Sequence, residues 1–251
     1  MYTDTEGIVL RQIKTINSRR MVLLFSRKYG KISAGSGISE KGRGKSALAM
    51  RPFTLGRYEL YKGRDTFNIN GAETLKSYYG IGEDVDKYMS ASYVLELTDK
   101  LTTEGQPVPQ LFELLNDFLR EIEHRDQDHG TLVAAFETKA LKAIGYLPEL
   151  RRCVICGNTE DAAVFSIKDG GIVCNQCIKN NRIDTNDTLI YDISFGIVDV
   201  LRYFLDNPLE SLENLRLDEK RLKDLRALIK HYTAYYLDLG ELKSETFLTW
   251  R

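Results

Sequence analysis

The sequence predicts an α+β protein, in which a small five-stranded barrel is followed by an α-helical domain with an inserted four-cysteine zinc ribbon. Three observations predict this class. Short β-rich runs separated by turns fill the first 80 residues, the apolar pattern becomes helical from Asp84, and all four cysteines fall between Cys153 and Cys177. We therefore expect a barrel domain in 1–80, a helical domain in 81–149 and 181–251, and a zinc-binding insertion in 150–180.

The first 80 residues alternate between apolar runs, rich in β-branched and aromatic side chains, and short polar turns. The expected strands are 7–14, 21–25, 31–34, 53–61 and 66–75. Five short strands at this spacing are typical of a small barrel. The interval 35–46 has four glycines and three basic residues without apolar periodicity, which predicts a loop.

From Asp84 onward apolar residues recur at the spacing of amphipathic helices. Asp84 can cap the first of them, Pro107 suits the first turn of the second, and Gly145 can end the third. The expected helices are 84–103, 107–122, 132–145, 192–205 and 218–239. The cysteine segment therefore lies between helices and is not a terminal domain.

The cysteines form two Cys-x2-Cys pairs, Cys153 with Cys156 and Cys174 with Cys177, separated by seventeen residues. Two such turns are a common arrangement for tetrahedral zinc, because each turn directs two sulfurs at one ion. Gly157 can adopt the positive φ that the first turn often needs. Four sulfurs leave zinc no open position for water, so we expect one structural Zn²⁺ ion. The alternatives are two disulfides or four free thiols, and both fit poorly because no other feature is typical of a secreted protein.

The sequence gives no sign of export or of membrane insertion. Residues 1–6 are polar and slightly acidic, unlike a signal peptide, and no apolar run approaches the roughly 18 residues that a membrane span needs. We therefore expect a cytoplasmic protein, a reducing compartment in which paired cysteines bind metal.

The net charge of −1 hides an asymmetry along the chain. Residues 1–80 contain 15 Lys and Arg against 6 Asp and Glu, whereas residues 81–251 contain 20 against 30. Between residues 7 and 58, Glu40 is the only acid. A surface that needs only to be soluble mixes both signs, so this excess predicts a surface that binds a polyanion such as nucleic acid. The alternative is that the basic residues only solvate a small domain.

Small five-stranded barrels bind oligonucleotides through a strand face and its flanking loops. The basic residues of the strands and of the 35–46 loop are the candidates to bind phosphate. The candidate DNA-binding residues are Arg11, Lys14, Arg19, Arg20, Arg27, Lys28, Lys31, Lys41, Arg43, Lys45 and Arg57. Phe25, Tyr29 and Tyr58 are candidates to stack on bases, and packing in the core is the alternative for each.

No motif predicts catalysis, so we assign no catalytic residue and expect no enzyme. Residues 42–46 end like a P-loop, but Ser39 stands where its first glycine is required, and Pro52 interrupts the helix that should follow. The three histidines form neither a zinc-hydrolase pair nor the His-x-Glu element of a base deaminase. A zinc enzyme would also need an open coordination position.

The order of these features resembles the RecO family of bacterial DNA repair proteins over nearly the whole chain. The matching segments are 7–11 (GIVLR), 23–31 (LLFSRKYGK), 51–60 (RPFTLGRYEL) and 136–150 (FETKALKAIGYLPEL), the last of which continues into 152–157 (RCVICG). The junction of the helix end with the first cysteine pair is more specific than a zinc ribbon alone.

The resemblance implies an OB-fold barrel that binds single- and double-stranded DNA, and a protein that anneals complementary strands. It also implies that the protein works with RecR and single-stranded DNA-binding protein to load RecA in recombinational repair. Such a protein is expected in the cytoplasm, associated with the nucleoid. Some family members lack a complete set of zinc ligands, whereas this chain has all four.

We therefore expect a non-enzymatic mediator of DNA recombination and repair, whose barrel binds DNA and whose acidic helical body presents protein partners. The alternative is a protein-interaction adaptor with a zinc ribbon, in which the basic barrel binds an acidic protein tail.

Overall fold

The computed structural model describes residues 1–14, 20–38, 44–64, 66–184, 187–193 and 196–248, except for the side chains of residues 13, 14 and 247. The chain forms two compact units. Unit 1 comprises Met1–His129 with Leu242–Thr249, and unit 2 comprises Gly130–Glu241. The boundaries of these units differ from those of the predicted domains, because two long helices and a C-terminal segment belong to the same unit as the barrel.

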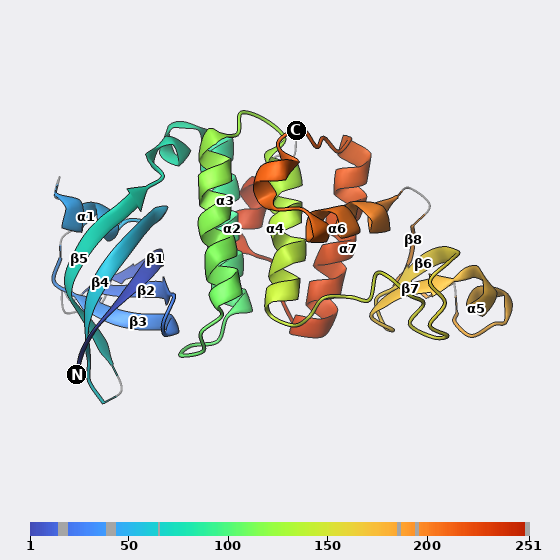
Figure 1. Cartoon of the computed structure of the whole chain (residues 1–251), viewed down its shortest axis with the longest axis horizontal. Coiled ribbons are helices and arrows are strands. Elements are labelled where there is room, and N and C mark those ends of the chain that lie inside the picture. Colours follow the sequence, from blue (N-terminus) through green and yellow to red (C-terminus); the bar gives the residue numbers. More distant parts are fainter. Residues whose placement is uncertain (15–19, 39–43, 65, 185–186, 194–195, 249–251) are drawn as a thin grey trace. The chain divides into compact units, whose positions relative to one another are not determined.

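Unit 1 begins with the predicted five-stranded barrel, drawn in blue to green in Figure 1. The strands are β1 Tyr2–Lys14, β2 Arg20–Ser26, β3 Gly30–Ser36, β4 Thr54–Lys62 and β5 Phe67–Ser77. They close in the order β1-β2-β3-β5-β4, with β3 parallel to β5, which is the strand order of an OB-fold. A five-residue helix, α1 Lys45–Ala49, lies between β3 and β4 and overlaps the end of the predicted loop.

The interior of the barrel is filled by alternate residues of its strands, as a half-buried sheet requires. Val9, Leu24, Ile32 and Leu60 are among the buried side chains. Tyr58 is fully buried, and its hydroxyl donates a hydrogen bond to the Ala49 carbonyl, which ties α1 to the barrel. Burial raises the pKa of Tyr58, so this hydroxyl stays a neutral donor.

The outer face of β1 and β2 is also buried, which a barrel strand facing water would not show. Ile8, Leu23 and Phe25 are at most 5% exposed, and the Phe25 ring lies 5.8 Å from the Phe112 ring of α3. The apolar run 21–25 is therefore buried on both faces, the pattern of a fully covered strand. Phe25 is buried against α3 and Tyr58 is buried inside the barrel, so both pack in the core, which was the alternative to stacking on bases.

The helices of unit 1 follow the barrel directly. They are η1 Tyr79–Glu83, α2 Val85–Leu101, α3 Pro109–His124 and, from the C-terminal segment, η3 Lys243–Phe247. Asp84 caps α2 as predicted, because its side chain accepts a hydrogen bond from the Lys87 backbone N–H.

The second helix begins at Pro109, two residues later than predicted. The Gly105 N–H donates to the Lys31 carbonyl, so the backbone before the helix is held against β3 and does not enter the helix at Pro107. Gly30 has φ +66°, and a Cβ at this position would collide with the Gln106 carbonyl. Tertiary packing, which the sequence pattern does not report, thus sets the start of α3.

Unit 2 consists of helices and the cysteine segment. Its elements are α4 His129–Ala143, β6 Ala162–Ser166, β7 Gly171–Cys174, α5 Asn175–Lys179, β8 Ile190–Asp192, α6 Ile197–Asp206, η2 Leu209–Leu212 and α7 Glu219–Leu237. The helix predicted from residue 192 begins only at Ile197, because Ile190–Asp192 pairs with β6 as an edge strand. α4 ends at Ala143, and Gly145 follows it with φ +82°, the C-terminal glycine that the sequence predicted.

Candidate metal centre and nucleic-acid interface

The four cysteines converge on one point within unit 2. Their sulfur atoms all lie within 4.8 Å of one another, with Sγ–Sγ distances of 3.8 Å for Cys153 and Cys177 and 3.6 Å for Cys156 and Cys174. A tetrahedral zinc with bonds of about 2.3 Å to sulfur separates its ligands by about 3.8 Å. Disulfide sulfurs lie about 2.05 Å apart, so the cysteines are not disulfide-bonded. The residues fit a single four-coordinate metal ion.

Two local structures position the sulfurs. In the first, the Gly157 N–H donates to the Cys153 carbonyl, and Gly157 has φ +77°, which confirms the turn predicted after the first pair. In the second, Cys174 ends β7 and precedes α5, which carries Cys177. The Cys174 N–H lies 3.4 Å from the Cys153 sulfur, a contact that favours a thiolate at this position.

The segment around the cysteines has a small apolar core and is anchored to the chain that precedes it. Val173 is fully buried beside Cys153, Cys174 and Cys177. Glu149 pairs with the Gly170–Ile172 turn, since its N–H donates to the Gly170 carbonyl and its carbonyl accepts from the Ile172 N–H. The helix-to-cysteine junction therefore has a structural basis: residues 149–154 lie along the ribbon hairpin.

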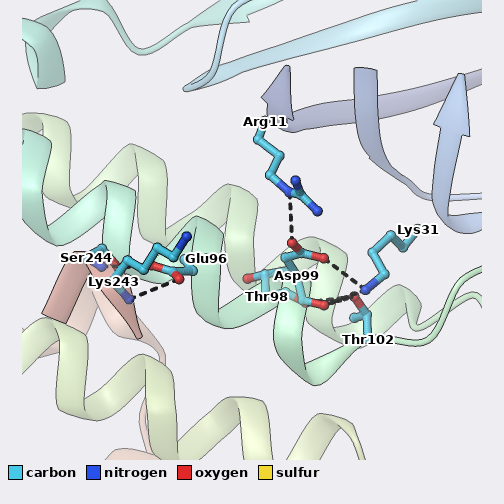
Figure 2. Close-up of polar contacts among 8 residues, drawn as sticks. All are labelled: Arg11, Lys31, Glu96, Thr98, Asp99, Thr102, Lys243 and Ser244. Atoms are coloured by element: carbon cyan, nitrogen blue, oxygen red, sulfur yellow. Dashed lines mark hydrogen bonds and ion pairs between the residues drawn. The ribbon is translucent and has the colours of Figure 1, made fainter. Parts of the chain in front are cut away.

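Two of the candidate DNA-binding residues form ion pairs with α2. Figure 2 shows Arg11 and Lys31 of the barrel directed at the Asp99 carboxylate, at 3.1 and 2.9 Å. The Lys31 side chain is only 15% exposed and that of Asp99 14%, whereas Arg11 is 57% exposed. Arg11 also lines a cavity of about 740 Å³ between β1, α2 and the C-terminal segment, so part of its guanidinium faces open space.

Arg27 is held in a similar way by α3. Its guanidinium forms ion pairs with Glu6 and Glu113, and its carbon Cζ lies 5.0 Å from the centre of the Phe112 ring. Arg11, Lys31 and Arg27 thus form ionic contacts beside the apolar face of β1 and β2 that packs on the helices. In this arrangement they are engaged within unit 1.

Arg57 and Lys28 are exposed but lie in different surroundings. Arg57 stands in β4 opposite Glu6 of β1 and Glu73 of β5, so cross-strand neighbours on both sides are acidic. Lys28, in the turn between β2 and β3, donates to the Thr3 hydroxyl and lies 5.5 Å from the centre of the Tyr29 ring. Tyr29 is half-buried, with its hydroxyl bonded to Thr3.

Three of the remaining candidates lie at the end of the barrel that carries α1: Lys14, by its backbone, Arg20 and Lys45. Lys14 and Arg20 are register partners, and Arg20 pairs in turn with Ser36. The Gln12 side chain donates to the Met50 carbonyl, which places α1 at this same end, and Lys45 begins α1 with an exposed side chain. Arg19, Lys41, Arg43 and the side chain of Lys14 lie outside the described residues.

The acidic partners Asp99 and Glu113 were not predicted from the sequence. Carboxylates on helices are usually solvated, and these two are 88 and 86 residues away from Arg11 and Arg27. The available signal was the continuous apolar run 21–25, which indicates that another element covers the outer barrel face.

Among the described residues, no helix is long and apolar enough to cross a membrane.

Comparison with known proteins identifies the family to which the chain is similar. The family model described as Recombination protein O N terminal matches residues 1–78, and that described as Recombination protein O C terminal matches residues 82–246. A DNA repair protein RecO of Alkaliphilus metalliredigens is 31% identical over 95% of each chain. Those of Thermoanaerobacter sp. and Listeria innocua are 27% and 31% identical over 97% of this chain, and over 96% and 92% of their own lengths. The chain belongs to the RecO family of DNA repair proteins.

Proposed function

We propose that this protein is a non-enzymatic recombination mediator. It binds single- and double-stranded DNA through its OB-fold, anneals complementary strands, and helps RecR to load RecA on DNA coated with single-stranded DNA-binding protein. The four cysteines hold one structural zinc ion, which stabilises the ribbon and takes no part in chemistry. The names of the relatives, DNA repair protein RecO, support the repair role.

The observation that carries the DNA-binding proposal is the set of cations at the α1 end of the barrel. Arg20 and Lys45 lie there, and the adjoining segments 14–19 and 39–43 add Lys14, Arg19, Lys41 and Arg43 in the sequence. Among the described residues Lys45 has no side-chain ion pair, in contrast to Arg11, Arg27 and Lys31. Phosphate binding there releases counterions, which favours association. The proposed interface is therefore this end of the barrel.

Annealing follows from the same electrostatics. Two DNA strands repel each other through their phosphates, and a cationic surface that neutralises part of this charge lowers the cost of bringing them together. No bond is made or broken, so no catalytic residue is required.

Titration of a fluorescent oligonucleotide at several salt concentrations tests the proposal. If six to ten phosphates are contacted, the affinity should fall on the order of 10³–10⁵-fold between about 50 and 200 mM salt. The triple variant Lys41→Glu, Arg43→Glu and Lys45→Glu should lose most of the binding, and Lys45→Glu alone should reduce the salt slope by about 1.

Arg57→Glu is the matched control for Lys45→Glu, because it reverses the same charge on an exposed barrel residue with acidic neighbours. It should change the affinity much less. Affinity that does not depend on salt, or equal losses for the two single variants, would contradict the proposed interface.

A further inference from the structure

A second basic segment lies in unit 2, far along the sequence from the barrel. Residues 138–159 contain four basic side chains and one acid, although residues 81–251 as a whole are acidic. The four are Lys139 and Lys142 near the end of α4, and Arg151 and Arg152 just before the first cysteine. None of the four is among the DNA-binding residues predicted from the sequence.

Lys139 and Lys142 stand three residues apart on α4, so their side chains are neighbours on one helix face. Lys142 is exposed and Lys139 is half-buried. Burial, and next the positive charge of Lys142, hold the pKa of Lys139 below its usual range, while Asp206 acts in the opposite direction. Asp206 is therefore among the charged groups that act on Lys139.

Two acids of this part of unit 2 are already paired with arginine. Asp206 forms an ion pair with Arg151 at 2.8 Å, and Glu149 forms one with Arg152 at 3.0 Å. Within the described parts of the chain, neither lysine has a hydrogen bond or an ion pair of its own. Because Glu149 is also anchored to the ribbon hairpin, Arg151 and Arg152 are presented from a fixed backbone.

Helix stability explains only part of this arrangement. A cation in the last turn of a helix interacts favourably with the helix dipole, which accounts for Lys142. It does not account for a half-buried lysine beside a second lysine, since burial and like charge both disfavour the ammonium. An arrangement that costs stability in this way indicates a site for an anion.

We propose that Lys139, Lys142 and Arg151 form a second phosphate-binding site, which takes the backbone of a nucleic-acid strand. This inference rests on the proposed function, because it adds a site for a second strand to the strand held by the barrel. Lysine ammoniums bind phosphate as point charges without reading base sequence, which suits a site that must accept any complementary strand.

The test compares two double variants of the full-length protein. Lys139→Gln with Lys142→Gln removes the proposed site, and Lys220→Gln with Lys223→Gln removes an exposed lysine pair of the same spacing on α7 of the same unit. Each is first saturated with one labelled strand, and capture of a complementary strand is then measured by energy transfer at several salt concentrations. Thermal unfolding verifies that both variants fold.

The site variant should bind the first strand within about twofold of the wild type. Its capture of the second strand should weaken at least about tenfold, and the salt slope of that step should fall by about 1.4, since single strands give about 0.7 per phosphate contact. The α7 control should behave like the wild type. Second-strand capture that is unchanged in the site variant, or reduced equally in the control, overturns the inference.

Competition with inorganic phosphate distinguishes a site for the DNA backbone from a site for free phosphate. If the site takes a DNA backbone, millimolar phosphate should slow second-strand capture by the wild type and have little further effect on the site variant. Saturable phosphate binding without any effect on strand capture would overturn the assignment to nucleic acid. If the wild type binds no DNA at all, the proposed function is contradicted together with this inference. If the wild type binds the first strand and only second-strand capture is absent, the result contradicts this inference alone.

Discussion

The Asp99 carboxylate forms ion pairs with two barrel residues, Arg11 and Lys31. The exposure of each partner determines how much its ion pair contributes to stability. Arg11 is largely exposed, so solvent screens its contribution. Lys31 and Asp99 are both about 15% exposed or less, and neither charge could be rehydrated fully if the other were removed. Asp99 is thus mainly a residue that fixes the barrel on α2.

Asp99→Asn should therefore lower the free energy of unfolding by about 1–3 kcal/mol, because it leaves the Lys31 ammonium without a charged partner. Urea unfolding followed by circular dichroism measures the change. Asp126→Asn is the control, since that side chain is 97% exposed and 4.0 Å from its partner Lys87. Equal stability of the wild type and Asp99→Asn would show that the pair contributes nothing.

Single residues also show what could be predicted from the sequence. Asp84 as a cap, Gly157 as a turn residue and the four cysteines as one cluster depend on neighbours close in sequence, and all three predictions are confirmed. The partners of Arg11 and Lys31 depend on Asp99, 88 and 68 residues away, and no local pattern reports such a pair. DNA binding by the basic set stays a prediction.

At the scale of elements, α2 holds the C-terminal segment as well as the barrel. Glu96 and Asp99 stand three residues apart on α2, and Figure 2 shows Glu96 directed at η3 while Asp99 faces the barrel. The Glu96 carboxylate accepts hydrogen bonds from the backbone N–H groups of Lys243 and Ser244 and from the Ser244 hydroxyl. An acid at this position satisfies the free N–H groups at the start of η3.

The attachment of η3 should depend on pH. Burial opposes ionisation of Glu96, but the hydrogen bonds from Ser244 and Lys243 outweigh it and hold the pKa of Glu96 below its usual value of 4.5. A carboxyl group with a lowered pKa in the folded state stabilises that state above its ordinary pKa, and this stabilisation is lost as the pH falls further.

We therefore expect the C-terminal segment to gain hydrogen exchange as the pH falls below about 4.5. Glu96→Gln should exchange faster already at neutral pH and lack this pH step, once intrinsic exchange rates are corrected for. Glu73→Gln, an exposed residue of β5, should keep the behaviour of the wild type. If the change in exchange with pH persists in Glu96→Gln, a group other than Glu96 is responsible for it.

The barrel strands and the long helices were predicted from the sequence, and the starts of two helices were misplaced for the same reason. Five strands and the long helices follow from periodicity, which is a local property. The starts of α3 and α6 were misplaced because the backbone before each pairs with a distant strand, β3 in one case and β6 in the other. Such pairing competes with helix formation and leaves no signal in the helical segment.

At the scale of the whole molecule, the cysteine cluster and the barrel belong to different units. All four cysteines lie in unit 2, whereas Arg20 and Lys45 lie in unit 1. A structural metal stabilises the segment that it closes, since its binding energy is available only to the folded ribbon. The consequences of metal loss should therefore be confined to unit 2.

One zinc ion per chain is expected, released by a strong chelator or by Cys156→Ser with Cys174→Ser. Its removal should make residues 150–180 sensitive to proteases while the barrel keeps its affinity for a single DNA strand within about twofold, because the fold of the barrel does not depend on it. Atomic absorption, limited proteolysis and oligonucleotide titration measure the three quantities. A large loss of first-strand affinity with the barrel intact would instead give the metal site a direct part in DNA binding.

The division of the chain has a consequence for the order in which the protein is made. Leu242–Thr249 completes unit 1, yet the ribosome makes it only after all of Gly130–Glu241. Domains usually fold as they emerge, N-terminal first. The contact between Glu96 and Ser244, which are 148 residues apart, can therefore form only after unit 2 has been made. The entropy cost of closing a loop grows only slowly with its length, so the length of unit 2 adds little to the cost of this contact.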